Sequence, residues 1–104
     1  LSMEMNLTGR RLTAREALSF GLVNRVVPVE SFLSEAKKLA HTIAAQPPLA
    51  VQAAKASVRH ALDSQLSEGL VFERQSFYRL FDTQDQKEGM KAFAEKRKPV
   101  WNGK

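Results

Sequence analysis

The sequence of 104 residues contains no cysteine, which excludes disulfide bonds, zinc–thiolate sites and cysteine nucleophiles. It has no apolar run long enough for a membrane-spanning helix, and its start lacks the basic and apolar regions of a secretory signal. That start also lacks an initiator methionine, so we expect a truncated chain. The glycine-rich phosphate loops and the nucleophile elbow of hydrolases are absent too. We therefore expect no self-contained active site in these residues.

The residues that are present are typical of one small globular domain or part of one. Hydrophobic residues make up 43% of the chain and charged residues 26%. Sixteen lysines and arginines against eleven aspartates and glutamates leave a net charge of +5. This balance favours anionic partners such as phosphates, nucleic acid or acidic lipid, and it does not choose among them.

Hydrophobic periodicity predicts a mainly helical chain. Residues 7–12 indicate an extended piece with a glycine turn. Thr13 and Glu16 then form a capping-box pattern before a short helix that Gly21 closes. The β-branched run 22–27 predicts a strand. Apolar spacings of three and four predict four further helices, between Pro28 and Gln46, from Pro48 to Asp63, over 65–81 and over 85–98.

Isolated titratable side chains on these helices have a chemical and a structural interpretation. Glu73 falls between Leu70 and Phe77 on an apolar stripe. It is either a general acid or base with a raised pKa, or one half of a buried ion pair with an arginine across a helix or subunit contact, which is the commoner case. His41 and His60 stand on different helices without another ligand at metal-binding spacing. We expect surface or interface histidines and no metal site.

The predicted last helix and its tail are strongly basic, with five lysines and arginines among the final fourteen residues. Phe93 and Lys96 are three residues apart, which makes them neighbours on a helix surface. Such a pair can hold a nucleotide, because the ring packs on the base while the ammonium group meets a phosphate. Alternatively, Phe93 belongs to the core and the cations stabilise the helix C-terminus through its dipole. The residues alone favour this alternative.

Three stretches of the sequence carry a more specific signal, in the following order. They are Leu7-Thr-Gly-Arg-Arg-Leu-Thr-Ala-Arg-Glu-Ala17 with Gly21-Leu-Val-Asn-Arg-Val-Val-Pro28; Pro47-Pro-Leu-Ala-Val51 with Lys55, Glu68-Gly-Leu70, Glu73 and Phe77; and Glu88-Gly-Met-Lys-Ala-Phe-Ala-Glu-Lys-Arg-Lys-Pro99 with Trp101 and Lys104. In this order and spacing the chain resembles the enoyl-CoA hydratase/isomerase (crotonase) superfamily over essentially its whole length.

The resemblance implies an α/β parent protein more than twice as long as this chain. In the family, an N-terminal spiral of ββα units supplies the oxyanion-hole N–H groups and the acid/base glutamates, and none of those segments is present here. Residues 1–28 are then the last turn of the spiral. Residues 29–104 are the C-terminal helical region, which makes trimers that are often paired into hexamers. The implied chain is mainly α, holds no catalytic residue and no metal, and is inactive alone.

The resemblance also implies a role for Phe93 and Lys96. The matching positions of the family's last helix contact the adenosine and phosphate part of coenzyme A, typically across a subunit boundary. Glu73 matches a structural glutamate. The implied parent is a cytoplasmic enoyl-CoA hydratase of fatty acid metabolism that adds water to a trans-2-enoyl-CoA. The coenzyme A thioester is its substrate, so no separate cofactor is implied, and no membrane partner is expected.

Other interpretations stay open at this point. Enoyl-CoA isomerases and acyl-CoA hydrolases of the superfamily share this C-terminal end. A non-enzymatic helical assembly module is a second class, and we expect exposed apolar surface and self-association in a lone monomer. Nucleic-acid binding through the basic last helix is permitted by the charge, but no motif supports it.

Overall fold

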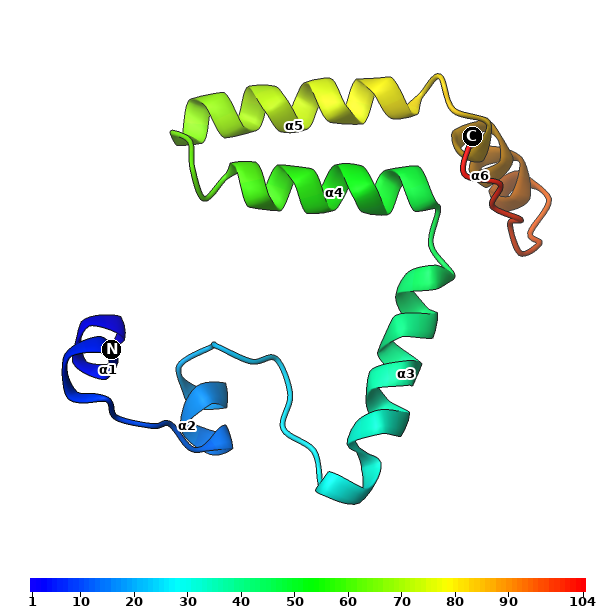
Figure 1. The fold of residues 1–104 in the computed structure, drawn as a ribbon. Helices are drawn as coiled ribbons and strands as arrows, with labels where there is room; N and C mark the ends of the chain where they lie inside the picture. The colour runs from blue at the N-terminus through cyan, green and yellow to red at the C-terminus, as the bar shows by residue number, and fades with distance from the viewer. The chain divides into compact units, whose positions relative to one another are not determined.

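The chain folds into helices joined by turns and irregular connections, and none of its 104 residues lies in a β-strand (Figure 1). The computed structural model describes residues 1–104 and divides into two compact units, Leu1–Lys37 and Lys38–Lys104. None of the helices combines the length and the apolar character that a membrane span requires. The helices are α1 (Ser2–Thr8), α2 (Ala14–Ser19), the 3-10 turn η1 (Val29–Ser31), α3 (Phe32–Ala44), α4 (Pro48–His60), α5 (Leu66–Leu80) and α6 (Gln84–Ala94). The prediction of a mainly helical chain is confirmed.

The first unit begins with α1, which the sequence did not predict. The extended piece expected over 7–12 is wrong at its start, because α1 continues to Thr8 and Gly9 ends it in the left-handed conformation, with φ 68°. The Thr8 hydroxyl donates to the Glu4 carbonyl at 2.6 Å and accepts the Arg10 N–H at 3.2 Å. This hydroxyl therefore links the last turn of α1 to the residues that follow.

The capping box predicted at the start of α2 is confirmed. The Glu16 N–H donates to Thr13 Oγ1 at 3.2 Å, and the Thr13 N–H donates to Glu16 Oε2 at 2.8 Å. The bond from the Thr13 N–H is the main reason why the pKa of Glu16 lies below its usual value. At the other end Gly21 has φ 72°, and the Leu22 N–H donates to the Ala17 carbonyl at 2.8 Å. Gly21 therefore closes α2 as expected.

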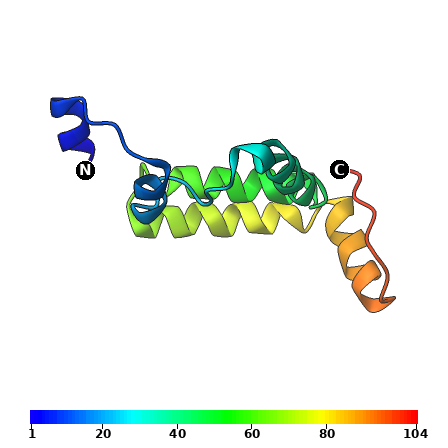
Figure 2. The ribbon, with the colours of Figure 1, turned by 90° about the horizontal axis from the view of Figure 1, so that it is seen from below.

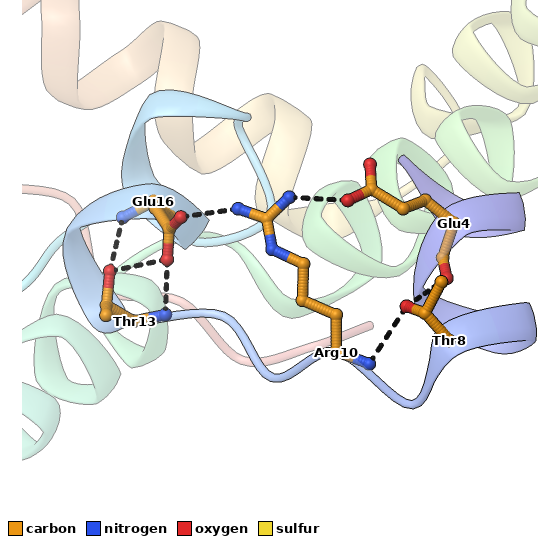
Figure 3. Close-up of polar contacts among 5 residues, drawn as sticks. All are labelled: Glu4, Thr8, Arg10, Thr13 and Glu16. Carbon is orange, nitrogen blue, oxygen red and sulfur yellow. Dashed lines mark hydrogen bonds and ion pairs between the residues drawn. The ribbon is translucent and has the colours of Figure 1, made fainter.

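One guanidinium group connects α1 to α2 (Figure 3). Arg10 Nη1 lies 2.8 Å from Glu4 Oε1, and Arg10 Nη2 lies 2.6 Å from Glu16 Oε1. These bonds, first to Glu4 and then to Glu16, raise the pKa of Arg10. The cluster is solvent-accessible and every charge in it is paired, so it orients the two short helices and leaves no group free for chemistry.

The strand predicted over 22–27 is wrong for this chain. These residues form an irregular connection between α2 and η1. A strand exists only through hydrogen bonds to a second strand, and residues 1–104 contain none to supply them. Leu22, Val23 and Val26 therefore remain exposed, although β-branched side chains favour strands.

In the second unit α4 and α5 lie side by side as an antiparallel pair (Figures 1 and 2). Pro48 occupies the first turn of α4, where its missing N–H would have no helical partner in any case. Near the connection between the helices, the His60 ring stacks on the Phe72 ring with 4.3 Å between centroids. The alanine-rich side of α4, including the half-buried Ala53, lets the two helices approach closely.

The C-terminal tail folds back onto the start of α6. Asp85, with 3% of its surface exposed, accepts the N–H groups of Asn102 at 2.7 Å and Gly103 at 2.9 Å. The Lys104 carbonyl in turn accepts the N–H groups of Gln84 at 2.6 Å and Asp85 at 3.2 Å. These bonds satisfy N–H groups that the first turn of a helix leaves without partners.

Trp101 makes a further contact that holds the tail, and its ring lies where a side chain at Gly89 of α6 would be. Its indole N–H donates to the Ala45 carbonyl at 2.9 Å. A Cβ atom at Gly89 would lie 3.3 Å from the Trp101 ring. A glycine inside a helix costs about 1 kcal/mol relative to alanine. Here it makes room for the tryptophan ring.

Little of the chain is fully buried. Ala92 and Asp85 are the two buried residues, while many large apolar side chains are exposed. They include Phe32, Leu33 and Ile43 on α3, Leu70 and Phe77 on α5, and Phe81 after it. The expectation of exposed apolar surface is therefore confirmed, and self-association stays a prediction.

Candidate functional site

The end of α6 is a turn built around Lys96. Glu95 caps the helix, and Lys96 follows with φ 53°, the one non-glycine residue with positive φ. The Lys96 N–H donates to the Phe93 carbonyl at 3.2 Å, and the Arg97 N–H donates to the Ala92 carbonyl at 3.0 Å. This is the Schellman arrangement, in which glycine usually takes the left-handed position. A side chain there costs about 1–2 kcal/mol.

The structure corrects the predicted extent of this helix. The prediction was 85–98, but α6 runs from Gln84 to Ala94. The left-handed residue Lys96 reverses the chain before Pro99 is reached, so the proline does not end the helix. Phe93 and Lys96 are therefore not neighbours on one helix surface, as the spacing suggested. They are joined instead by the backbone hydrogen bond of the turn.

Arg97 ties this turn to the preceding helix. Its Nη1 and Nη2 atoms lie 2.6 and 2.9 Å from the two carboxylate oxygens of Glu88, and its Nε lies 2.6 Å from Glu95 Oε2. Glu88 also accepts the Val100 N–H at 2.9 Å. The fork-to-carboxylate geometry is the strong form of an arginine ion pair. It fixes the chain on both sides of Lys96.

These contacts control the ionisation of the pair. Hydrogen bonds from Arg97, and then from the Val100 N–H, lower the pKa of Glu88 from 4.5 to about 2. The same pairing, with Glu88 first and Glu95 second, raises the pKa of Arg97. Both partners are therefore charged throughout the pH range in which proteins normally work.

Phe93 and Lys96 are the residues for which the sequence indicated binding. The Phe93 side chain has 88% of its surface exposed, so the alternative that it is a core residue is wrong in this chain. Lys96 is exposed as well, and no carboxylate pairs with it. An open aromatic face followed by an unpaired ammonium group can stack on a planar base and attract a phosphate.

Glu73 does not form a buried site. It lies exposed on α5, at the edge of an apolar depression that Val58 and Phe77 also line. No hydrogen bond or ion pair joins Glu73 to another residue of this chain. Its environment does not fit a buried general acid, and an ion pair across a subunit contact stays a prediction.

The histidines also lie apart. His41 is exposed near the end of α3, while His60 is half-buried against Phe72. No group of three or more histidine, aspartate or glutamate side chains lies close enough to hold a metal ion.

Three residues of the α6 region were not recognised from the sequence. Glu88 and Arg97 are nine residues apart, which looks like two unrelated charges on a solvated helix. Only a chain reversal brings them together. Helices that reverse in this way usually have glycine at the left-handed position, so a lysine there gives no indication of the reversal. Asp85 stands at the start of the predicted helix over 85–98, and its role as acceptor for the tail depends on the same chain reversal.

Comparison with known proteins places the whole chain in one family. The enoyl-CoA hydratase/isomerase family model matches residues 1–104. A probable mitochondrial enoyl-CoA hydratase of Dictyostelium discoideum is 52% identical over 103 residues, which cover 99% of this chain and 37% of the relative. The mitochondrial enoyl-CoA hydratase of Pongo abelii is 46% identical over 98 residues, covering 94% of this chain and 34% of that protein.

A solved structure agrees with these relatives. The crystal structure of an enoyl-CoA hydratase from Bacillus anthracis matches with a TM-score of 0.89 and 40% identity, over 94% of this chain and 38% of that one. The chain belongs to the enoyl-CoA hydratase/isomerase family, whose fold is that of the crotonase superfamily. It spans well under half the length of the relatives that it matches.

Proposed function

We propose that residues 1–104 are the C-terminal part of a longer enoyl-CoA hydratase that adds water across the double bond of a trans-2-enoyl-CoA. Within that protein, residues 1–28 would end the spiral core and residues 29–104 would form the helical region. The proposal is supported by the match of the family model over the whole chain and by relatives named enoyl-CoA hydratase. The relatives include bacterial and mitochondrial proteins, so a cytoplasmic location stays a prediction.

The proposed role of this part is to bind the nucleotide end of coenzyme A. The observation that carries it is the turn after α6, where the exposed Phe93 ring is followed by the unpaired Lys96 ammonium group. The ring would pack on the adenine and the cation would attract a phosphate. Binding energy gained far from the reacting atoms helps to orient the thioester.

The bond chemistry would belong to the rest of the protein. Preorganised N–H donors would stabilise the thioester enolate, an effect of about 3 kcal/mol per donor, and a glutamate would activate the water. The residues described here offer no such constellation. Glu73 is exposed and unpaired, and the other carboxylates near the turn are held in ion pairs.

Product analysis with the full-length protein tests the reaction. A hydratase converts crotonyl-CoA to 3-hydroxybutyryl-CoA. An isomerase instead moves the double bond of a 3-enoyl-CoA without taking up water, and a hydrolase releases free coenzyme A. We expect the hydrated product from the full-length protein and no turnover by residues 1–104 alone. Turnover by the short chain would contradict the placement of the catalytic groups outside it.

A second candidate is a helical assembly module, favoured by the exposed apolar side chains of α3 and α5. Both candidates predict oligomers, a trimer or a hexamer for the full-length enzyme. Light scattering combined with coenzyme A binding separates them. Association of the full-length protein without affinity for coenzyme A would favour the assembly module.

A further inference from the structure

We propose that Glu88 and Arg97 are positioning residues of the nucleotide site, whose ion pair holds the left-handed turn that presents Lys96. They act on the substrate only through Lys96 and do not touch it themselves. This inference rests on the proposed function of the turn. It adds two residues, nine apart in sequence, for which the Phe93 and Lys96 pattern gives no hint.

The backbone of the turn explains why such residues are needed. Lys96 is held at φ 53°, a conformation that lysine disfavours and glycine accepts. A residue stays in such a conformation only when several surrounding contacts hold it there. Here the Schellman bonds of Lys96 and Arg97 are supplemented by the side chain of Arg97, which joins Glu88 at 2.6 and 2.9 Å. Glu88 also holds the returning chain through the Val100 N–H.

The distribution of charge assigns phosphate binding to Lys96 rather than to Arg97. All three guanidinium nitrogens of Arg97 already donate to Glu88 or Glu95, and Nη1 also donates to the Lys98 carbonyl. Lys96 has no carboxylate partner. The positive charge of Arg97 is therefore compensated by the carboxylates of Glu88 and Glu95, while the ammonium group of Lys96 remains available to an anion.

Removal of Glu88 separates positioning from direct binding. A carboxylate cannot attract a phosphate, so if Arg97 were the true ligand, Glu88→Ala would release its two Nη atoms from the carboxylate and strengthen binding of the anionic nucleotide. If Glu88 positions Lys96, the same substitution weakens binding. The two accounts therefore predict opposite signs for one variant.

The experiment is a double-mutant cycle in the full-length protein, with KM and kcat measured for crotonyl-CoA and for crotonyl-pantetheine, which lacks the nucleotide. We expect Glu88→Ala and Arg97→Ala each to raise the KM for crotonyl-CoA by about threefold, with kcat within about twofold. The KM for crotonyl-pantetheine stays unchanged, which general structural damage would not allow. In a Lys96→Ala background, Glu88→Ala has no further effect, because coupled residues are not additive.

The matched control is Arg10→Ala, which removes another guanidinium that bridges two carboxylates and leaves both KM values unchanged. Glu88→Gln keeps the shape of the side chain, and it should show a weaker form of the same effect if Glu88→Ala fails to fold. A lower KM in Glu88→Ala, or additive losses in the Lys96→Ala background, would overturn the inference. If Lys96→Ala alone leaves the KM for crotonyl-CoA unchanged, the proposed function of the turn fails as well.

Discussion

At the scale of the residue, Lys96 combines an unfavourable backbone conformation with the proposed role of binding a phosphate. Glycine is the residue that the left-handed position prefers, as Gly9 and Gly21 show at the ends of α1 and α2. A lysine at the third such turn costs free energy and supplies a cation that glycine lacks. Strain held at a single position is typical of a site kept for function.

Lys96→Gly should therefore stabilise the turn while it weakens coenzyme A binding. We expect slower exchange of the Arg97 amide proton in the full-length protein, by an amount equivalent to about 0.5–1 kcal/mol, and a higher KM for crotonyl-CoA. Lys96→Ala is the control, since it removes the ammonium group without relieving the backbone. An Arg97 amide that exchanges equally fast in both variants would contradict the strain at this position.

The ionisation of the Glu88 carboxyl group provides a test of its ion pair with Arg97, which holds the turn. Because its pKa is lowered from 4.5 to about 2, its stabilising effect is complete above pH 4.5 and is lost as the pH falls towards 2. Titration of the Glu88 side-chain carbon by NMR should show this low pKa. In Arg97→Ala the pKa should return towards 4.5. A wild-type pKa close to 4.5 would mean that the ion pair does not form in solution.

At the scale of the element, α6 and the tail that returns along it form one unit. The helix starts with its first N–H groups bound to the Lys104 carbonyl, and it ends with Arg97 folded back onto Glu88. Asp85 is the buried charge that joins the two ends of this element. A buried charge is tolerated only with such partners.

Asp85→Ala should release the tail. The change leaves the N–H groups of Asn102 and Gly103 without their acceptor, and bonds to a charged group contribute about 1.5–3 kcal/mol. We expect hydrogen exchange of these two amides in the full-length protein to accelerate by at least about tenfold. Asp63→Ala, at an exposed aspartate outside α6, should leave their exchange unchanged. Equal exchange in both variants would show that Asp85 does not hold the tail.

The element scale also shows where sequence analysis succeeds and fails. The Thr13 capping box, the Pro48 start of α4 and the Gly21 turn were predicted because each depends on residues within one helical turn. The strand over 22–27 was wrong because pairing depends on a partner that this chain does not contain. The turn at Lys96 was missed because lysine is a poor indicator of left-handed backbone.

At the scale of the whole molecule, the chain leaves much apolar surface exposed and matches only part of the length of its relatives. The chain spans 37% of the Dictyostelium discoideum relative and buries few of its own large apolar residues. Surfaces of this kind normally contact another chain or segment. The candidate site could be located at Phe93 and Lys96 through the resemblance, whereas its support by Glu88 and Arg97 required the folded chain.

The most direct test of the central claim, that this region binds the nucleotide and leaves the chemistry to the rest of the protein, is one kinetic comparison. Full-length wild type and the Phe93→Ala/Lys96→Ala variant are assayed with crotonyl-CoA and crotonyl-pantetheine. Loss of base stacking and of the cation should raise the KM for crotonyl-CoA by about tenfold or more. The kcat and the crotonyl-pantetheine kinetics should not change. An unchanged KM for crotonyl-CoA, or a loss confined to kcat, would contradict the account.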